Sequence, residues 1–286
     1  MTLPQGPGFP YQLLFADDAH EAPSLPQSFR DIYPGDWRLP QPRDGRPYTY
    51  SNFGMSRDGR ISFNEPGQEA AVHVTLGAAH DVWLMALLRM RADAIMVGDT
   101  TVRLEGRHFW TSDFIYPPDG PAFNAQRQAE GYRPLPLLVL LTLNGDINFA
   151  ANCFKRNDLH VVVATTNRGA EVLSDARCNA KLDIHAFGDE TADLTRMAQM
   201  LHSDYGVNNL LCEGGSRVFA NMLNAGLIDE EFVTWCPTLV GRSADHPRPS
   251  YTEGVAWMPG HTPYSKPLSL HRGGDYIFLR TRCQYP

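Results

Sequence analysis

Polar and apolar residues alternate over Tyr48–Phe53, which is the pattern of a strand with one buried face. The apolar run Ala94–Val97 predicts a second, fully buried strand that stops at Gly98. A short helix is expected from Asp99 or Thr100 to Glu105. Strand, glycine and helix in this order are typical of an α/β fold.

A longer helix is expected between these two strands. Val82, Met85 and Leu88 recur at helical spacing and fall on one face. Asp81 directly precedes this run, so its carboxylate suits the N-cap position. Arg89 lies at the other end, where a cation interacts favourably with the helix macrodipole.

The remainder of the chain continues the alternation of strands and helices. Further strands are expected at 137–141, 159–164, 209–212, 231–236 and 276–282, and further helices at 191–202 and 216–224. Two stretches rich in proline and glycine, 107–134 and 242–267, are expected to be loops. The pattern predicts an α/β fold with a mixed, mostly parallel sheet flanked by helices and antiparallel pairing near the C-terminus.

The first 47 residues differ from the remainder of the chain. They are rich in proline, which leaves little room for helices, and they carry several aromatic residues. Disordered tails are usually poor in aromatic residues. We therefore expect residues 1–47 to form an arm that docks on a domain comprising residues 48–286.

Composition excludes several classes of function. The chain has 286 residues, 32 acidic and 25 basic, a formal net charge of −7 and a pI near 5.8. This balance argues against partners such as nucleic acid or an anionic membrane surface. No apolar run approaches a membrane span and the N-terminus lacks the pattern of a secretory signal, so a cytoplasmic location is expected. Five scattered cysteines without a Cys-x-x-Cys pair predict ordinary thiols and no metal site.

The segment Leu210–Phe219 carries the clearest chemical signal. An apolar strand is followed by Glu213, Gly214 and Gly215, and a helix opens at Ser216. Glycines let a phosphate approach the main chain, and the free N–H groups of a helix N-terminus attract anions. A tight turn without a ligand is the alternative interpretation. Neither a G-x-G-x-x-G fingerprint nor a Walker A loop is present.

A similar turn follows the strand at 94–97. Gly98 precedes Thr100 and Thr101, whose hydroxyls can cap a helix or bind a phosphate or a cofactor amide. Two strand–glycine–helix turns in one α/β domain can bracket one extended ligand. A third segment, Ser56–Arg60, reads as a strand, an Asp-Gly turn and another strand.

Together these segments resemble a known family. The runs Gly54–Arg60, Arg91–Glu105, Leu211–Gly215 and Leu223–Glu230 occur in the order and spacing of the pyrimidine reductase of riboflavin biosynthesis, the reductase half of the bifunctional deaminase–reductase. The resemblance covers about residues 48–282 and extends more distantly to dihydrofolate reductase. It implies a dihydrofolate-reductase-like fold, NADPH as cofactor, a homodimer and a cis Gly214–Gly215 peptide.

The resemblance also assigns roles to individual residues. By the resemblance, the cofactor-binding positions are Gly54, Thr101, Glu105, Gly214, Gly215, Ser216 and Arg217, and the turn after the strand at 94–97 adds Gly98 and Thr100. The substrate-binding positions are Arg89, Glu213, His73 and Thr75, with Arg89 on the phosphate and Glu213 as the catalytic carboxylate. From the residues alone, Arg89 can equally be a surface residue that caps a helix. Candidates for the cofactor 2′-phosphate are Arg103, Thr142, Thr166 and Arg168.

The chain also departs from the family pattern. Many members carry a lysine where this chain has Asn52, and Asp99 and Thr100 occupy positions that are usually small. The His-x-Glu and Pro-Cys-x-x-Cys motifs of the deaminase half are missing, so no zinc deaminase is expected. These departures leave the substrate more open than the cofactor.

The residues and the resemblance support three hypotheses for function. The first is NADPH-dependent reduction of the ribosyl group of 5-amino-6-(5-phosphoribosylamino)uracil to ribityl. The second is a dihydrofolate or pterin reductase that uses Asp81, which lies near the pterin-binding carboxylate of dihydrofolate reductases in the sequence but also suits an N-cap. The third is a non-catalytic paralogue that binds NADP.

Overall fold

The computed structural model describes residues 2–17 and 24–286. Residues 1 and 18–23 of the predicted arm lie outside this description. The strands are β1 (Gln12–Ala16), β2 (Tyr48–Met55), β3 (Ala94–Gly98), β4 (Leu137–Leu141), β5 (His160–Thr165), β6 (Lys181–Ala186), β7 (Asn209–Cys212), β8 (Glu230–Trp235), β9 (Tyr264–Gly273) and β10 (Tyr276–Gln284). The α-helices are α1 (Gln27–Arg30), α2 (Val72–Thr75), α3 (Ala79–Met90), α4 (Asp99–Leu104), α5 (Ser112–Ile115), α6 (Gly120–Ala129), α7 (Asn167–Val172), α8 (Leu194–Ser203) and α9 (Ser216–Asn224).

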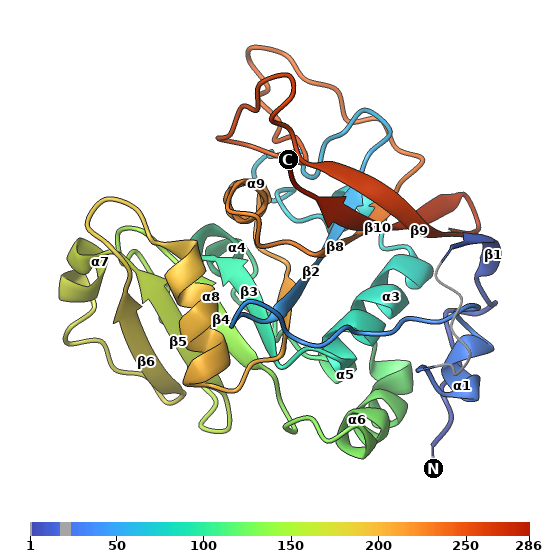
Figure 1. Ribbon diagram of the computed structural model, residues 1–286, viewed down its shortest axis with the longest axis horizontal. Helices are drawn as coiled ribbons and strands as arrows, with labels where there is room; N and C mark the ends of the chain where they lie inside the picture. The colour runs from blue at the N-terminus through green and yellow to red at the C-terminus, as the bar shows by residue number, and fades with distance from the viewer. Residues whose placement is uncertain (1, 18–23) are drawn as a thin grey trace.

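All of these strands belong to one twisted sheet with the order β1-β9-β10-β8-β2-β7-β3-β4-β5-β6 (Figure 1). Every pairing from β8 to β6 is parallel, whereas β10 pairs antiparallel with both β8 and β9, and β1 with β9. The predicted mixed sheet with an antiparallel C-terminal part is therefore confirmed. The parallel strands place the turns after β3 and β7 at one edge of the sheet.

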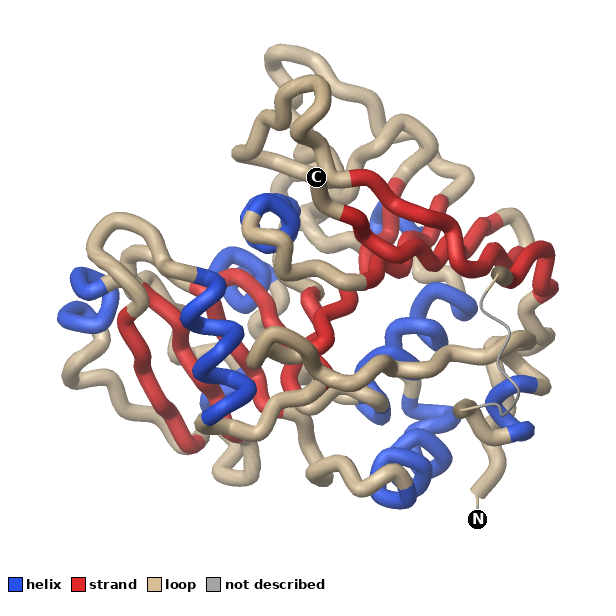
Figure 2. The backbone as a smooth tube through the Cα atoms, viewed as in Figure 1, coloured by secondary structure: helices blue, strands red, loops and turns tan. Residues whose placement is uncertain are grey.

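The helices cover the parallel strands and bury two main apolar clusters. One cluster joins α3 and the arm to the sheet, and the other joins α8 and α9 to it. Figure 2 shows α3, α5 and α6 grouped on one side of the central strands. In the parts of the chain that the structure describes, no helix has the length and apolarity that crossing a membrane requires. The five cysteines are all free thiols, as predicted.

The arm packs into the main core, as expected. Tyr11, Phe29, Tyr33 and Trp37 are each at most 2% exposed and belong to the same cluster as α3. The ring of Tyr11 lies 5.1 Å from that of Phe278 in β10. β1 adds an edge strand to the sheet, which the proline-rich pattern did not predict.

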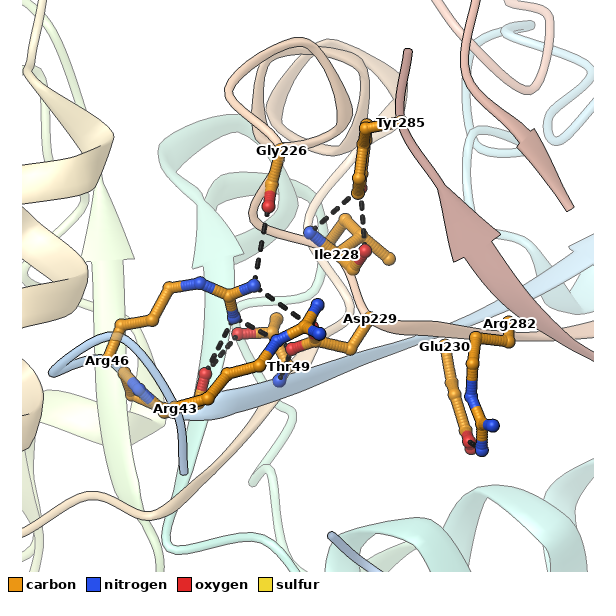
Figure 3. A network of polar contacts seen from close by, with 10 residues as sticks. Arg43, Arg46, Thr49, Gly226, Ile228, Asp229, Glu230, Arg282 and Tyr285 are labelled. Atoms are coloured by element: carbon orange, nitrogen blue, oxygen red, sulfur yellow. Dashed lines mark hydrogen bonds and ion pairs between the residues drawn. The ribbon is translucent and has the colours of Figure 1, made fainter. Parts of the chain in front are cut away.

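A polar network fastens the end of the arm (Figure 3). The carboxylate of Asp229 accepts hydrogen bonds from Arg46 at 2.7 and 2.9 Å and from Arg43 at 2.8 Å. Its Oδ2 atom also accepts from the backbone N–H of Thr49 in β2. Asp229 and Arg46 are both buried, so the loss of Asp229 would leave the charge of Arg46 uncompensated.

Three predicted local features are wrong. Residues 107–134 are largely helical, with α5, a 3₁₀ turn over Pro117–Asp119, and α6. Pro121 lies in the first turn of α6, where no backbone N–H is needed, so the prolines mark a helix start. Asp81 is not an N-cap, because α3 begins at Ala79. Gly59 forms the predicted turn, with φ +78°, but no second strand follows it.

Candidate active site

Two glycine turns lie side by side at the carboxyl edge of the sheet. β3 and β7 pair in parallel, so the turn at Gly98 adjoins the turn at Gly214. A Cβ atom at Gly214 would lie 2.9 Å from Cγ1 of Val218, and a Cβ atom at Gly98 would lie 3.2 Å from Cγ2 of the same side chain. Both glycines therefore let α9 pack closely on the sheet.

The N-terminus of α9 is open to an anionic group. Gly215 is its N-cap residue and supplies no side-chain cap. Nothing lies within 4 Å of a Cβ atom placed at Gly215. Gly215, Ser216 and Arg217 line an open cavity, so the N-terminus of α9 is accessible, which is favourable for a phosphate.

The expected cis peptide at this turn is wrong. The Gly214–Gly215 bond is trans. Gly215 has φ −57° and ψ 170°, an ordinary extended backbone. The chain therefore makes the turn with a normal peptide bond.

Both turns line one cavity of about 810 Å³, here called the first cavity. The predicted cofactor residues that line it are Gly98, Thr100, Thr101, Glu105, Gly214, Gly215, Ser216 and Arg217. Gly54 lies apart from them, in the neighbouring second cavity. Of the candidates for the 2′-phosphate only Thr142 lines the first cavity, which is also lined by the exposed Arg242.

The second cavity has a volume of about 770 Å³. It shares a border with the first, lined by Phe53, Ala70, Ala71, Thr101, Leu104, Glu105 and Glu213. Thr75 and Arg89, two of the predicted substrate residues, line the second cavity, whereas His73 lines neither. A Cβ atom at Gly54 would lie 2.3 Å from Cγ2 of Thr75, so only glycine fits there.

Arg89 and Glu213 form a buried ion pair between the cavities. Arg89 Nε donates to Glu213 Oε1 at 2.9 Å, and Arg89 Nη2 donates to Oε2 at 2.6 Å. The side chains are only 2% and 8% exposed. The interpretation of Arg89 as a surface residue is therefore wrong. The bidentate geometry fixes the orientation of the Glu213 carboxylate.

Asp81 and Asn52 also line the second cavity, and both carry hydrogen-bond acceptors. Neither is among the substrate residues that the sequence predicted for the first hypothesis. Asp81 is 4% exposed, and burial raises the pKa of its carboxyl to about 6. Asn52 is also buried, and among the described residues its Oδ1 has no hydrogen-bond partner. A buried oxygen without a partner is unusual in a folded protein, so a ligand in this cavity is one group that can satisfy it.

The second cavity also contains three basic side chains that the sequence did not single out: Arg107, His108 and Lys155. Arg107 and Lys155 are exposed, whereas His108 is largely buried beside Arg89. The only local signal for His108 is its spacing of three residues from Glu105. Lys155 comes from the loop after β4, and only the fold brings it here.

The sheet order and the two adjoining cavities define an α/β protein of the dihydrofolate-reductase-like class. Solved structures support this fold. RibD of Acinetobacter baumannii matches 84% of this chain with a TM-score of 0.63 and 20% identity, and this chain spans 59% of that protein. A pyrimidine reductase-like protein from Corynebacterium diphtheriae matches with a TM-score of 0.60 and 20% identity, covering 84% of this chain and 93% of its own.

The chain belongs to the RibD C-terminal domain family, whose model matches residues 47–256. A relative from Archaeoglobus fulgidus, a 2,5-diamino-6-ribosylamino-4(3H)-pyrimidinone 5′-phosphate reductase, is 26% identical over 68% of this chain and 83% of its own length. A protein of the same name from Methanothermobacter thermautotrophicus is 28% identical over 68% of this chain and 80% of its own. The chain is therefore an oxidoreductase of the riboflavin-biosynthesis reductase type.

Proposed function

We propose that this chain uses NADPH to reduce the ribosyl group of a ribosylaminopyrimidine 5′-phosphate to ribityl. The observation that carries the proposal is the meeting of two cavities at Glu213, one lined by two glycine turns and the other by polar and basic side chains. One cavity suits a dinucleotide and the other a small phosphorylated molecule. The family membership supports the same pairing of ligands.

The first cavity fits NADPH. The turn at Gly214 has no room for a side chain, and the open N-terminus of α9 suits the pyrophosphate. The exposed Arg217 and Arg242 line the same cavity and are suited to the 2′-phosphate. When bound, NADPH supplies the hydride for the reduction.

The protein residues prepare the carbon that receives the hydride. In its open form the substrate carries a C=N bond between C1′ of the sugar and the ring amine. Glu213, oriented by Arg89, stabilises the protonated C=N bond, which is the more electrophilic form. Hydride adds to C1′, the π electrons move to nitrogen, and its positive charge is neutralised.

The substrate phosphate is assigned to Arg107 and Lys155. The charge of Arg89 is already balanced by Glu213, whereas Arg107 and Lys155 are exposed basic side chains at the edge of the second cavity. This revises the expectation that Arg89 binds the phosphate itself. Arg89 instead positions the carboxylate.

The pyrimidine ring is assigned to Asp81 and Asn52. The curated relatives act on a ring with an amino group at C2, where the uracil of our first hypothesis has a carbonyl. A carboxylate can accept from both N3–H and the 2-amino group, but it repels a carbonyl. We therefore expect the 2,5-diaminopyrimidinone to be the better of the two substrates.

The position of Asp81 also keeps a pterin reductase as a second candidate, because a pterin presents the same pair of donors. Dihydrofolate has no ribose phosphate for Arg107 and Lys155, and its negative charge lies on the carboxylates of its glutamate tail. We expect no measurable turnover of dihydrofolate. A protein that binds NADPH but oxidises it with none of these substrates would support the non-catalytic alternative.

The test is an anaerobic assay of NADPH oxidation with both pyrimidine phosphates, their dephosphorylated forms and dihydrofolate. Removal of the phosphate should raise KM at least 10-fold, the effect of about 1.4 kcal/mol. Glu213→Gln should lower kcat by about 100-fold, because a neutral amide stabilises the cationic C=N bond poorly. Its affinity for NADPH, measured by fluorescence quenching, should remain. Unchanged turnover in Glu213→Gln would refute the role of this carboxylate.

A further inference from the structure

His108 lies in the second cavity between Glu105 and Glu213, the two carboxylates that border both cavities. Its ring packs against Trp110, with ring centroids 5.0 Å apart, and edge-on against Phe114 at 4.8 Å. Its side chain is only 15% exposed. The imidazole is therefore held in one orientation by its aromatic neighbours.

The contacts of His108 define which ring nitrogen carries the proton. Arg89 Nη1 lies 2.9 Å from His108 Nε2, and a guanidinium nitrogen can only donate. Nε2 therefore accepts, and the proton of the neutral ring is on Nδ1. Nδ1 lies 3.6 Å from Oε2 of Glu105, which is beyond hydrogen-bond distance but makes this carboxylate a close neighbour of Nδ1.

The surroundings keep this ring neutral. Burial lowers the pKa of His108 to about 2, and the adjacent guanidinium of Arg89 acts in the same direction. The charged groups that face the ring are Arg89 from α3, Glu105 at the end of α4 and, through Arg89, Glu213 after β7. A protonated ring would offer no acceptor to Arg89.

A continuous series of polar groups results, running from Glu105 through His108 and Arg89 to Glu213. Arg89 uses Nε and Nη2 for Glu213 and Nη1 for His108. The backbone oxygens of Phe109 and Thr111 lie at 3.4 Å from Nη1 and add weaker contacts. This series connects Glu105, which lines both cavities at the C-terminal end of α4, to Glu213, the proposed catalytic carboxylate.

We propose that His108 is a positioning residue for the reduction: it holds Arg89, and thereby Glu213, through Nε2, and it orients Glu105 through Nδ1–H. The expected changes in kcat rest on the proposed function, whereas the expected changes in NADPH affinity do not require a substrate. The contact with Arg89 affects kcat through the orientation of Glu213, and the contact with Glu105 affects the binding of NADPH. The two contacts are separable by substitution.

The experiment compares three substitutions at this one position. His108→Gln retains an acceptor near Nε2, His108→Asn retains a donor near Nδ1, and His108→Leu retains neither. We expect His108→Gln to keep kcat within about 3-fold, since its side-chain oxygen can still accept from Arg89, which holds Glu213. His108→Asn should lose about 10- to 150-fold in kcat, the range of one hydrogen bond to a charged group, but keep its affinity for NADPH. His108→Leu should have both a lower kcat and a lower affinity for NADPH.

His160→Leu is the matched control. His160 also pairs with a carboxylate, that of Asp183 at 2.7 Å, but it lies on β5 and lines neither cavity. Its substitution should leave kcat and the NADPH affinity unchanged. Equal losses in all three His108 variants would indicate a packing role and overturn the proposal, as would wild-type behaviour of His108→Leu.

The NADPH titration separates this proposal from the proposed function. If the wild-type protein turns over none of the pyrimidines, the proposed function fails. The weaker NADPH binding of His108→Leu relative to His108→Asn can still be measured, because it requires no substrate. Equal NADPH affinities of these two variants would overturn the assigned contact with Glu105.

Discussion

Asp81 and Glu213 are two buried carboxylates in one cavity with different surroundings. Glu213 receives two hydrogen bonds from the guanidinium of Arg89. Asp81 has no ion pair among the described residues and lies next to hydroxyl-bearing side chains such as Thr75. Burial without a cation disfavours the charged form, which is why the pKa of Asp81 is raised to about 6.

Asp81→Asn should therefore stabilise the protein while impairing substrate binding. Because the folded pKa of about 6 exceeds the ordinary value of 3.8, the folded state binds more protons between these values. Stability then falls as pH rises through this window, and the full loss persists above pH 6. At pH 7.5 the free energy of unfolding of the variant should be about 3 kcal/mol higher than that of the wild type. The difference should vanish near pH 4 in urea titrations.

Asp58→Asn is the matched control with the opposite sign. Hydrogen bonds from the backbone N–H of Val240 and Gly241 and from Ser56 outweigh desolvation and lower the pKa of Asp58 to about 2. Its contribution is present above the unfolded pKa and is lost as pH falls through the folded pKa. Asp58→Asn should thus be less stable than the wild type at pH 7.5. A stabilised Asp58→Asn, or an Asp81→Asn variant unchanged at every pH, would contradict these roles of the two carboxylates.

At the scale of elements, the two glycines in the turn between β7 and α9 have different surroundings. Gly214 is enclosed by Val218, whereas Gly215 has open space on its Cβ side. Both glycines line the first cavity. One glycine is needed for the fold of the turn, and the other keeps the cavity accessible.

Gly214→Ala and Gly215→Ala should consequently have different effects. Gly214→Ala should lower the melting temperature, since a contact of 2.9 Å with Val218 forces the helix away, at a cost of about 1–3 kcal/mol. Gly215→Ala has an allowed backbone conformation and should melt as the wild type does. It should nevertheless weaken NADPH binding at least 10-fold, an effect of about 1.4 kcal/mol. Calorimetry and NADPH titration measure the two effects, and full NADPH affinity in Gly215→Ala would argue against this cavity as the cofactor site.

Elements with strong local patterns were predictable, and those that depend on partners were not. β3 and α9 follow directly from an apolar run and from an amphipathic run that ends before Gly226. β9 contains Pro267, which local rules place outside strands, yet the proline lies opposite Thr281 at the register shift, where the regular ladder is interrupted. This segment is a strand because it pairs with β10 along its length and with β1 on its other side.

At the scale of the whole molecule, the arm is part of the core. Trp37 is fully buried and packs edge-on against Tyr50 and Phe232, with ring centroids 5.2 and 5.3 Å away. Its backbone oxygen also accepts a hydrogen bond from Arg91. The division of the chain at residue 47 stays a prediction, but the packing makes independent folding of residues 48–286 unfavourable.

Trp37→Ala should destabilise the protein by about 3–5 kcal/mol, because a large cavity would remain between the arm and the sheet. Trp37→Phe should lose less, since an aromatic ring still fills most of the space. Deletion of residues 1–47 should abolish the cooperative thermal transition, whereas deletion of residues 1–3 should not. Calorimetry and near-UV circular dichroism provide the measurement. A cooperative transition in the protein without residues 1–47 would show that the arm is dispensable.

The homodimer and the cytoplasmic location also belong to this scale and stay predictions. β1 is the edge of the sheet, and Leu14 and Phe15 are 46% and 44% exposed on it. Light scattering after size-exclusion chromatography determines the oligomeric state directly.

The sequence alone determined the fold class, the family resemblance and both glycine turns, because these depend on local periodicity and on residues close together in the chain. It also proposed Arg89, Glu213 and Glu105 as site residues, and all three line the cavities, although their roles stay predictions. Only the tertiary structure decided that Arg89 is paired with Glu213, that Asp81 lies in a cavity, and that His108 joins Glu105 to Arg89. The contacts of Arg89 arise from side chains 19 and 124 residues away, whose burial and charge are set by neighbours that no local pattern records.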